Sequence, residues 1–416
     1  MARKLYELQV DEQGRIVLDE RLRRELGLQS GASVCLEVDG GRLRLHTPLT
    51  HLQRVYVEPT NACNLDCRTC MRSVWDEPLG RMSAETFGKV LEGLRSFSPP
   101  PTVFFGGFGE PLSHPGVLEM VRQAKALGGP VELITNGTLL TEEVSRALVR
   151  LGLDRLWVSL DGARPESYED VRLGALLPQV LDNLAKLYLL RLQAYNSGPK
   201  LGIAFVAMQR NIGDLPELVR LGERLGADRF SISNVMAHTT ELQQEMLYTR
   251  AVDTAAQQQG TATKTMDLPR IDINSTTLDP LAFLLRGGHN IRLNGQELPW
   301  LADACPFVER GSLSVRWDGA VSPCLPLLHR HVSFLGERLR QAHAYAVDTL
   351  EKRSLQEIWL DPGYVDLRRR LQQFDFAPCT SCNSCELADA NLEDCYNNPL
   401  PACGGCLWAQ GVIQCP

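Results

Sequence analysis

The stretch RVYVEPTNACNLDCRTC, residues 54–70, joins a short apolar segment to three closely spaced cysteines. Its first residues, rich in β-branched and aromatic side chains, predict a buried β-strand. Cys63, Cys67 and Cys70 follow with the spacing C-x3-C-x2-C, so one tight loop can wrap a single iron–sulfur cubane. A saturated [4Fe–4S] cluster takes four cysteines, and the next one in the sequence is Cys305. Three thiolates would leave one iron open to another ligand; the alternative is a structural zinc site with a distant fourth ligand.

The segment that follows, to about residue 235, alternates predicted strands with amphipathic helices. Strands are predicted at RVYVEP (54–59), TVFFGG (102–107), VELITNG (131–137), RLWVSLDG (155–162), LGIAFVAM (201–208) and RFSISNV (229–235). Helices are predicted at 83–97, 115–128, 141–152 and 213–226, with Ser83 and Thr141 as N-caps. Six such units predict an α/β fold, a parallel sheet curved into a full or partial (β/α)6 TIM-type barrel. Chemistry in that fold gathers at the C-terminal ends of the strands.

Polar residues stand at the ends of these strands. GGFGEPL (106–112) exposes backbone groups at its glycines and places Glu110 where it can bind an ammonium or hydroxyl group. Asn136 ends the third strand, and the period of two puts Ser159 and Asp161 of the fourth on one face. Each has a structural alternative, a turn for Glu110 and Asn136 and a helix cap for Asp161. Their occurrence together behind a cysteine trio favours a site for a small amphoteric ligand.

This constellation resembles the radical S-adenosylmethionine (SAM) superfamily over residues 52–235. The cysteine spacing matches that family's C-x3-C-x2-C motif, and the loop 107–110 matches its glycine–glutamate motif, which holds the SAM amino group largely through backbone atoms. The residues expected to bind SAM are Gly107, Gly109, Glu110, Asn136, Ser159 and Asp161. Thr69 stands where many members have an aromatic residue, which weakens an adenine contact at this position.

The resemblance implies an enzyme with a [4Fe–4S] cluster on Cys63, Cys67 and Cys70 whose open iron takes the amino and carboxylate groups of SAM. A low-potential electron, from a donor such as ferredoxin, would cleave the sulfur–C5′ bond. The resulting 5′-deoxyadenosyl radical would abstract a hydrogen atom from a substrate, inside a barrel that excludes water.

Nine further cysteines lie between residues 305 and 415. CPFVERGSLSVRWDGAVSPC (305–324) predicts a hairpin with a Trp-Asp-Gly turn and both thiols at its base. It resembles the opening of the SPASM domain, an auxiliary-cluster extension of many radical SAM enzymes. By order in that family, Cys305, Cys324 and Cys395 would serve one auxiliary [4Fe–4S] cluster and Cys379, Cys382 and Cys385 a second, with Cys403, Cys406 and Cys415 completing the sets. Zinc ribbons are the alternative for the C-x2-C pairs.

The C-terminal segment as a whole, ending CGGCLWAQGVIQCP (403–416), most resembles radical SAM/SPASM maturases associated with tungsten-containing aldehyde:ferredoxin oxidoreductases. This implies a role in maturing such an oxidoreductase or its pterin cofactor. Two alternatives stay open: a radical SAM/SPASM enzyme that modifies a peptide, and a cluster-bearing DNA-binding redox regulator.

Residues 1–48 predict a β-rich module with a helix near residues 20–26 and a last hairpin around residues 39–41. The pattern resembles the swapped-hairpin AbrB-type domain, whose members are mostly dimeric DNA-binding factors. Eight basic and eight acidic residues through position 46 favour a homodimer contact or substrate docking over DNA binding. Cys35 alternates with apolar neighbours and is expected to be a small core residue.

Four parts are therefore predicted: the AbrB-like module at 1–48, the radical SAM barrel at 49–235, an insertion or linker at 236–300 with a helical patch at 241–252, and the SPASM-like domain at 301–416, with one or two helices at 354–374.

Composition limits the remaining classes. The hydrophobic content of 44% is that of a globular protein, and the net charge of -7 weighs against a nucleic-acid binder. The sequence has no stretch of about 18 apolar residues and no signal peptide, so we expect a cytoplasmic protein without a membrane span. Thirteen cysteines in that reducing compartment favour cluster or metal ligands over disulfides.

Overall fold

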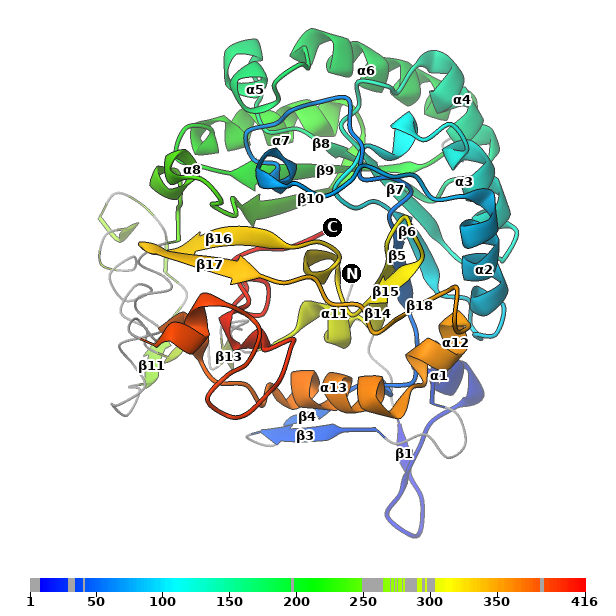
Figure 1. Ribbon diagram of the computed structural model, residues 1–416, viewed down its shortest axis with the longest axis vertical. Coiled ribbons are helices and arrows are strands. Elements are labelled where there is room, and N and C mark those ends of the chain that lie inside the picture. The colour runs from blue at the N-terminus through cyan, green and yellow to red at the C-terminus, as the bar shows by residue number, and fades with distance from the viewer. Residues whose placement is uncertain are drawn as a thin grey trace.

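The computed structural model describes residues 8–28, 34–39, 42–195, 198–248, 304–381 and 385–416, with short pieces between residues 265 and 297 (Figure 1). Six parallel strands follow one another along the chain: β5 (Arg54–Val57), β6 (Thr102–Phe105), β7 (Val131–Thr135), β8 (Arg155–Ser159), β9 (Lys200–Ala207) and β10 (Ala227–Asn234). Each coincides with a predicted strand, which confirms the α/β fold and its parallel, partial barrel.

Helices cover the outer face of this curved sheet, as Figure 1 shows. They are α2 (Ala84–Leu94), α3 (Val117–Lys125), α4 (Glu142–Arg150), α5 (Pro165–Val171), α6 (Leu177–Gln193) and α7 (Leu215–Arg224). Ser83 accepts a hydrogen bond from the N–H of Thr86, and Thr141 accepts one from Val144. Both predicted N-caps are confirmed. Of the patch predicted at 241–252, the structure describes α8 (Thr240–Gln244), and its part from residue 249 lies outside the described residues.

The C-terminal segment extends the same sheet. Residues of β14 (Ser312–Val315) pair in parallel with β5, and β15 (Ala320–Ser322) and β18 (Asp348–Thr349) follow antiparallel. The sheet therefore has nine strands in the order β10-β9-β8-β7-β6-β5-β14-β15-β18. The hairpin predicted at 305–324 is present, and its first strand joins the open edge of the barrel.

Further elements of this segment surround that edge. They are α11 (Pro306–Glu309), the paired strands β16 (His331–Leu335) and β17 (Arg338–Ala342), and the helices α12 (Leu355–Trp359) and α13 (Pro362–Gln373). The segment 354–374, predicted to form one or two helices, therefore forms two. A small sheet holds β11 (Thr265–Leu268), β12 (Asn290–Leu293) and β13 (Gln296–Glu297).

Residues 412–414 contact the end of β10, the other edge of the barrel. The Asn234 side-chain amide donates to the carbonyl of Val412 at 2.9 Å, and the backbone N–H of Gln414 donates to Ser233 Oγ at 3.1 Å. Leu407 and Ile413 are buried in an apolar cluster with methionines of the barrel mouth. The end of the described chain is therefore held against the barrel, and Figure 1 shows it inside the curve of the sheet.

The N-terminal module contains β1 (Gln9–Val10), β2 (Ile16–Val17), α1 (Glu20–Glu25), β3 (Leu36–Asp39) and β4 (Arg42–Leu45), in the predicted order. The turn at residues 40–41 lies outside the described residues, and the AbrB-like assignment stays a prediction. Cys35 is exposed, so its expected place in a core was wrong. Among the residues that the structure describes, Val38 and Leu43 of the β3–β4 hairpin are 67% and 60% exposed.

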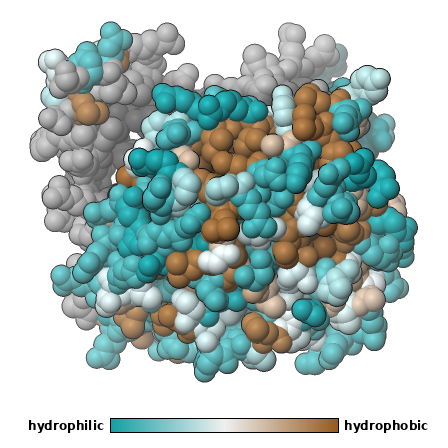
Figure 2. All heavy atoms as spheres, turned by 90° about the horizontal axis from the view of Figure 1, so that it is seen from above, coloured by the Kyte–Doolittle hydropathy of each residue, from teal (hydrophilic) through white to brown (hydrophobic). Residues whose placement is uncertain are grey.

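Seen from above, the surface is mostly hydrophilic, with hydrophobic side chains gathered in its upper middle (Figure 2). In the part of the chain that the structure describes, no helix has the length and apolar character to cross a membrane.

Candidate functional site

The three cysteines of the loop after β5 line a pocket at the C-terminal edge of the sheet, with a volume of about 140 Å³. The ends of β6, β7 and β8 supply the other walls. The candidate residues that line it are Cys63, Cys67, Cys70, Gly107, Gly109, Glu110, Asn136 and Ser159. Of the residues predicted for this site, Asp161 alone does not line the pocket.

The glycine loop lies close against the segment that leads into the cysteine loop. Gly107 has a φ of +147°, and a Cβ there would lie 2.7 Å from Cγ of Glu58. A Cβ on Gly109 would lie 2.2 Å from the carbonyl oxygen of Thr60. Because a side chain at either position would displace neighbouring atoms, only glycine allows the backbone to approach this closely. The loop therefore offers backbone amides and carbonyls to a ligand.

Glu110 is buried, and its carboxylate binds other parts of the barrel. Oε1 accepts from the Thr135 hydroxyl at 2.8 Å and from the N–H of Leu112 at 2.9 Å, and Oε2 accepts from the N–H of Asn136 at 2.7 Å. Burial raises the pKa of Glu110, and the hydrogen bond from Asn136 offsets part of this effect. The side chain thus ties the loop after β6 to the end of β7.

Two side chains place N–H groups beside the cysteine sulfurs. The Asn136 amide nitrogen lies 3.8 Å from Cys63 Sγ, and Arg172 Nη1 lies 3.9 Å from Cys67 Sγ. Burial raises the pKa of both thiols. Binding iron requires the thiolate form, which hydrogen bonds and a nearby cation stabilise. Three cysteines that line one pocket, with such donors beside them, fit the ligand set of a [4Fe–4S] cluster held by three thiolates.

Asp161 acts on this pocket through Arg172. Its Oδ2 accepts from Arg172 Nε at 2.7 Å, and its Oδ1 accepts from the N–H of Val206 at 2.8 Å. Asp161 is fully buried, whereas the guanidinium of Arg172 lines the pocket. Burial alone would lower the pKa of Arg172, but the charges of Asp161 and Cys67 outweigh it, and the pKa is raised. A fixed cation, which the sequence did not point to, therefore faces the pocket.

A second cavity, of about 90 Å³, lies beneath the C-terminal tail and is lined by four cysteines. Cys305 precedes α11 and Cys324 follows β15, while Cys403 and Cys406 belong to the tail. Burial raises the pKa of Cys305 to about 12. Burial also raises the pKa of Cys324, with a further contribution from the other three thiols. Four cysteines on one cavity match the number of ligands that a [4Fe–4S] cluster takes.

Cys305 and Cys324, expected in one auxiliary cluster, share this cavity with the tail cysteines Cys403 and Cys406, and the expected assignment of Cys395 to the same cluster stays a prediction. Cys395 is exposed and lies outside it. Buried Cys379 lies on the turn η5 (Cys379–Ser381), which packs against η7 (Cys403–Gly405). Of the remaining three cysteines, Cys385 is half-buried and Cys382 is outside the described residues. Cys415 accepts a hydrogen bond from Trp408 and packs against the same apolar cluster as Cys305 and Cys324.

Two family models match the chain: the radical SAM superfamily over residues 57–193, and the SPASM iron–sulfur cluster-binding domain over residues 305–386. The first match contains the three-thiol pocket. The second contains Cys305 and Cys324, and it ends before Cys403 and Cys406.

The chain is also similar to individual proteins, over different shares of its length. The tungsten-containing aldehyde ferredoxin oxidoreductase cofactor-modifying protein of Pyrococcus furiosus is 30% identical over 369 residues, 88% of this chain and 97% of that protein. The PqqA peptide cyclase of Gluconobacter oxydans is 30% identical over 178 residues, 42% of this chain and 48% of that protein. Streptococcus suis SuiB bound to the precursor peptide SuiA superposes with a TM-score of 0.52 at 15% identity, over 77% of this chain and 67% of that one, which is a likeness of fold.

Proposed function

The chain belongs to the radical SAM superfamily and carries a SPASM domain, and on this premise we propose that it is a maturase for a tungsten-containing aldehyde ferredoxin oxidoreductase or its pterin cofactor. As an enzyme of that family its cofactors are a [4Fe–4S] cluster, SAM and auxiliary iron–sulfur clusters. The observation that carries the maturation role is the similarity to the Pyrococcus protein over nearly the whole of both chains.

Cys63, Cys67 and Cys70 hold the SAM-binding cluster in this proposal. When cluster and SAM are bound, one-electron reduction cleaves the sulfur–C5′ bond and supplies a 5′-deoxyadenosyl radical. The backbone around Gly107 and Gly109 binds the amino group of SAM. The Arg172 guanidinium, fixed by Asp161, lies in the same pocket and is suited to bind the SAM carboxylate. Asn136 and Ser159 line the remaining wall.

Cys305, Cys324, Cys403 and Cys406 hold one auxiliary cluster. Their common cavity supports this set, because all four cysteines line it and the thiol of Cys324 interacts electrostatically with the other three. A second auxiliary cluster draws on the cysteines at 379–395 and the tail. Nine thiols for eight positions leave one spare.

The proposed chemistry requires an electron donor, and the N-terminal module offers a contact for a second copy of the chain. A low-potential donor such as ferredoxin supplies the electron. The N-terminal module joins two copies of the chain, which the exposed Val38 and Leu43 of its hairpin support. Peptide modification is the second candidate, and it rests on shorter matches, such as that to the PqqA peptide cyclase.

The cleavage step is tested with anaerobically reconstituted protein, SAM and dithionite. Wild-type protein should form 5′-deoxyadenosine, and Cys67→Ala should lower the rate by at least about 100-fold, because it removes a cluster ligand. Cys35→Ala, an exposed cysteine of the N-terminal module, is the matched control and should leave the rate unchanged. Equal rates for Cys67→Ala and wild type would refute the assignment.

The maturation role is tested by producing a tungsten-containing aldehyde oxidoreductase with and without this protein. The oxidoreductase should carry active, fully assembled cofactor with the wild-type chain and lack it with Cys67→Ala. Full activity in the absence of this chain would contradict the role and leave the cleavage chemistry standing.

A further inference from the structure

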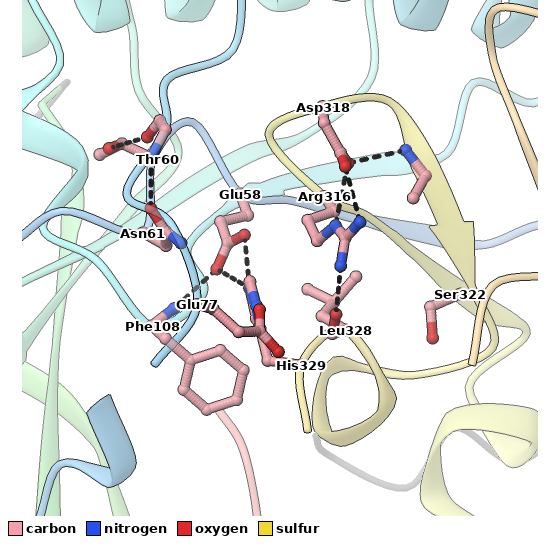
Figure 3. Close-up of polar contacts among 12 residues, drawn as sticks. Glu58, Thr60, Asn61, Glu77, Phe108, Arg316, Asp318, Ser322, Leu328 and His329 are labelled. Carbon is pink, nitrogen blue, oxygen red and sulfur yellow. Dashed lines mark hydrogen bonds and ion pairs between the residues drawn. The ribbon is translucent and has the colours of Figure 1, made fainter. Parts of the chain in front are cut away.

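His329, from the C-terminal segment, is buried between two carboxylates of the barrel segment. Its Nε2 lies 2.9 Å from Glu58 Oε2, and its Nδ1 lies 2.5 Å from Glu77 Oε2. The side chains of His329 and Glu58 are 0% exposed, and that of Glu77 is 17% exposed. Figure 3 shows the imidazole between the two carboxylates, with Phe108 beside it. An imidazole that meets a carboxylate at each nitrogen donates from both, which requires the protonated form.

The two carboxylates bracket the cysteine loop. Glu58 follows β5 directly, five residues before the first cysteine, and Glu77 follows the turn η1 (Met71–Val74), which begins after the third. Since His329 binds both, it holds the two ends of the segment that carries all three cluster cysteines. A change at His329 would therefore alter the position of that loop.

The same histidine contacts the glycine loop. The N–H of Phe108 donates to Glu58 Oε1 at 3.2 Å, and the Phe108 ring meets the imidazole edge-on at a centroid distance of 5.5 Å. Trp75, from the segment after the cysteines, stacks on the imidazole at 4.4 Å with an interplanar angle of 28°. A stacked indole also favours the cationic form of the ring. Phe108 stands between Gly107 and Gly109, so the contact reaches the backbone that faces the pocket.

His329 also links the two cavities along the chain. It follows Cys324 by five residues, across the turn η4 (Leu325–Leu327), and precedes His331, which lines the four-thiol cavity. One short segment, residues 324–331, thus runs from a thiol of the auxiliary cavity to the loops of the SAM pocket.

Charges around His329 favour a cation at this place. Burial lowers its pKa, but the hydrogen bonds and charges of Glu58 and then of Glu77 outweigh burial, and the pKa is raised. The other charged or titratable groups nearby are Arg316, which pairs with Asp318, Arg330, which pairs with Asp76, and the buried His331 and His238. The N–H of Arg330 donates to Glu77 Oε1 at 3.0 Å and helps to fix that carboxylate.

We propose that His329 is a positioning residue for SAM, an imidazolium that clamps the cysteine loop and the glycine loop to the auxiliary domain. This rests on the proposed function, since it assumes that SAM binds in the three-thiol pocket. The clamp sets the spacing between the cluster and the backbone that holds the SAM amino group. It acts on SAM binding through Glu58 and Phe108, without touching SAM itself.

The clamp predicts a specific pH dependence of SAM binding. Because the folded pKa of His329 is raised, the clamp is complete at low pH and is lost as the pH rises through that value. SAM affinity should therefore fall on the alkaline side in the wild-type protein. His329→Gln removes the titrating group, and its affinity should be weak and nearly independent of pH in that range.

The experiment measures the Kd of SAM for the reconstituted, reduced protein by the change that SAM causes in the cluster's electron paramagnetic resonance spectrum. His329→Gln should raise this Kd by about 10- to 100-fold, the usual effect of losing a group that orients a ligand set. Iron content should stay at the wild-type value. His343→Gln, at a half-buried histidine of the same segment outside the clamp, is the matched control and should leave the Kd unchanged.

Each outcome decides the proposal. A Kd and pH profile for His329→Gln equal to those of His343→Gln would overturn it. If His329→Gln loses iron, Glu77→Gln decides in its place, because it keeps the bond to Glu58 and should give a smaller rise in Kd. An unchanged Kd in Glu77→Gln would then overturn the clamp. Absence of any SAM effect in the wild-type protein would instead refute the proposed function.

Discussion

The pocket at the strand ends takes its three thiols from eight consecutive residues, whereas the cavity beneath the tail takes its four from segments between Cys305 and Cys406. The first is local, and its walls are loops that end successive strands. The second exists only because the tail folds back onto the hairpin of β14 and β15. In our account the first leaves one iron open for SAM, and the second is closed by its own cysteines.

The difference lies also in what surrounds the sulfurs. A cation and an amide face the thiols of the first pocket, namely Arg172 and Asn136. The second cavity is lined mainly by apolar side chains, such as Phe307 and Leu407, with Arg340 as a cation in its wall, and burial raises the pKa of its thiols. A polar pocket suits a zwitterionic ligand, and an apolar one suits a buried cluster that exchanges electrons only.

Among the variants that test this contrast, Asp161→Asn is expected to have the largest effect on SAM binding. The substitution removes the charge that fixes the buried Arg172 and should raise the KM for SAM by about 10- to 100-fold. Breaking a buried pair should also lower the free energy of unfolding by about 3 kcal/mol. Glu119→Gln, which affects the exposed pair with Arg122, is the control and should leave both the KM and the stability nearly unchanged. An unchanged KM in 5′-deoxyadenosine assays would show that Arg172 does not bind SAM.

A smaller effect on catalysis is expected from Cys403→Ala. Losing one of four ligands should remove about four of about twelve irons per chain, while SAM cleavage continues at the other cluster. Iron analysis and the yield of 5′-deoxyadenosine measure both. Cys395→Ala is the critical comparison, because family order assigned it to the same cluster. If Cys395→Ala loses that cluster and Cys403→Ala keeps it, the grouping in the cavity is wrong.

The smallest effect is expected from Val38→Asp in the N-terminal hairpin. A charge at this exposed apolar position should convert a dimer into a monomer in sedimentation experiments, without changing SAM cleavage. Glu37→Gln, at the adjacent position, should leave the assembly state unchanged. A wild-type protein that is already monomeric would contradict the role given to the module.

Much of the barrel could be predicted because its information is local. Short apolar segments rich in β-branched and aromatic residues mark most of the strands from β5 to β10, and Ser83 and Thr141 cap helices through hydrogen bonds to residues three positions on. The pairing of β14 with β5 joins segments far apart in sequence, and no local pattern encodes it. The same applies to the cavity that unites Cys324 with Cys406.

Two residues show why part of the site could not be predicted from the sequence. Asp161 was placed on the face of Ser159 by strand alternation, but β8 ends at Ser159, so the alternation no longer applies two residues later. The carboxylate turns to Arg172 and Val206 instead. Glu58 stands alone before a proline, and only the folded structure shows that His329 binds it.

The most direct test of the contrast between an open and a closed thiol set is electron–nuclear double resonance on reduced protein with SAM labelled with 15N at its amino group and 17O at its carboxylate. Our account predicts hyperfine coupling to both labels in the wild type and in Cys403→Ala, and its loss in Cys67→Ala. Coupling that persists in Cys67→Ala, or that disappears in Cys403→Ala while the first cluster is retained, would contradict the account.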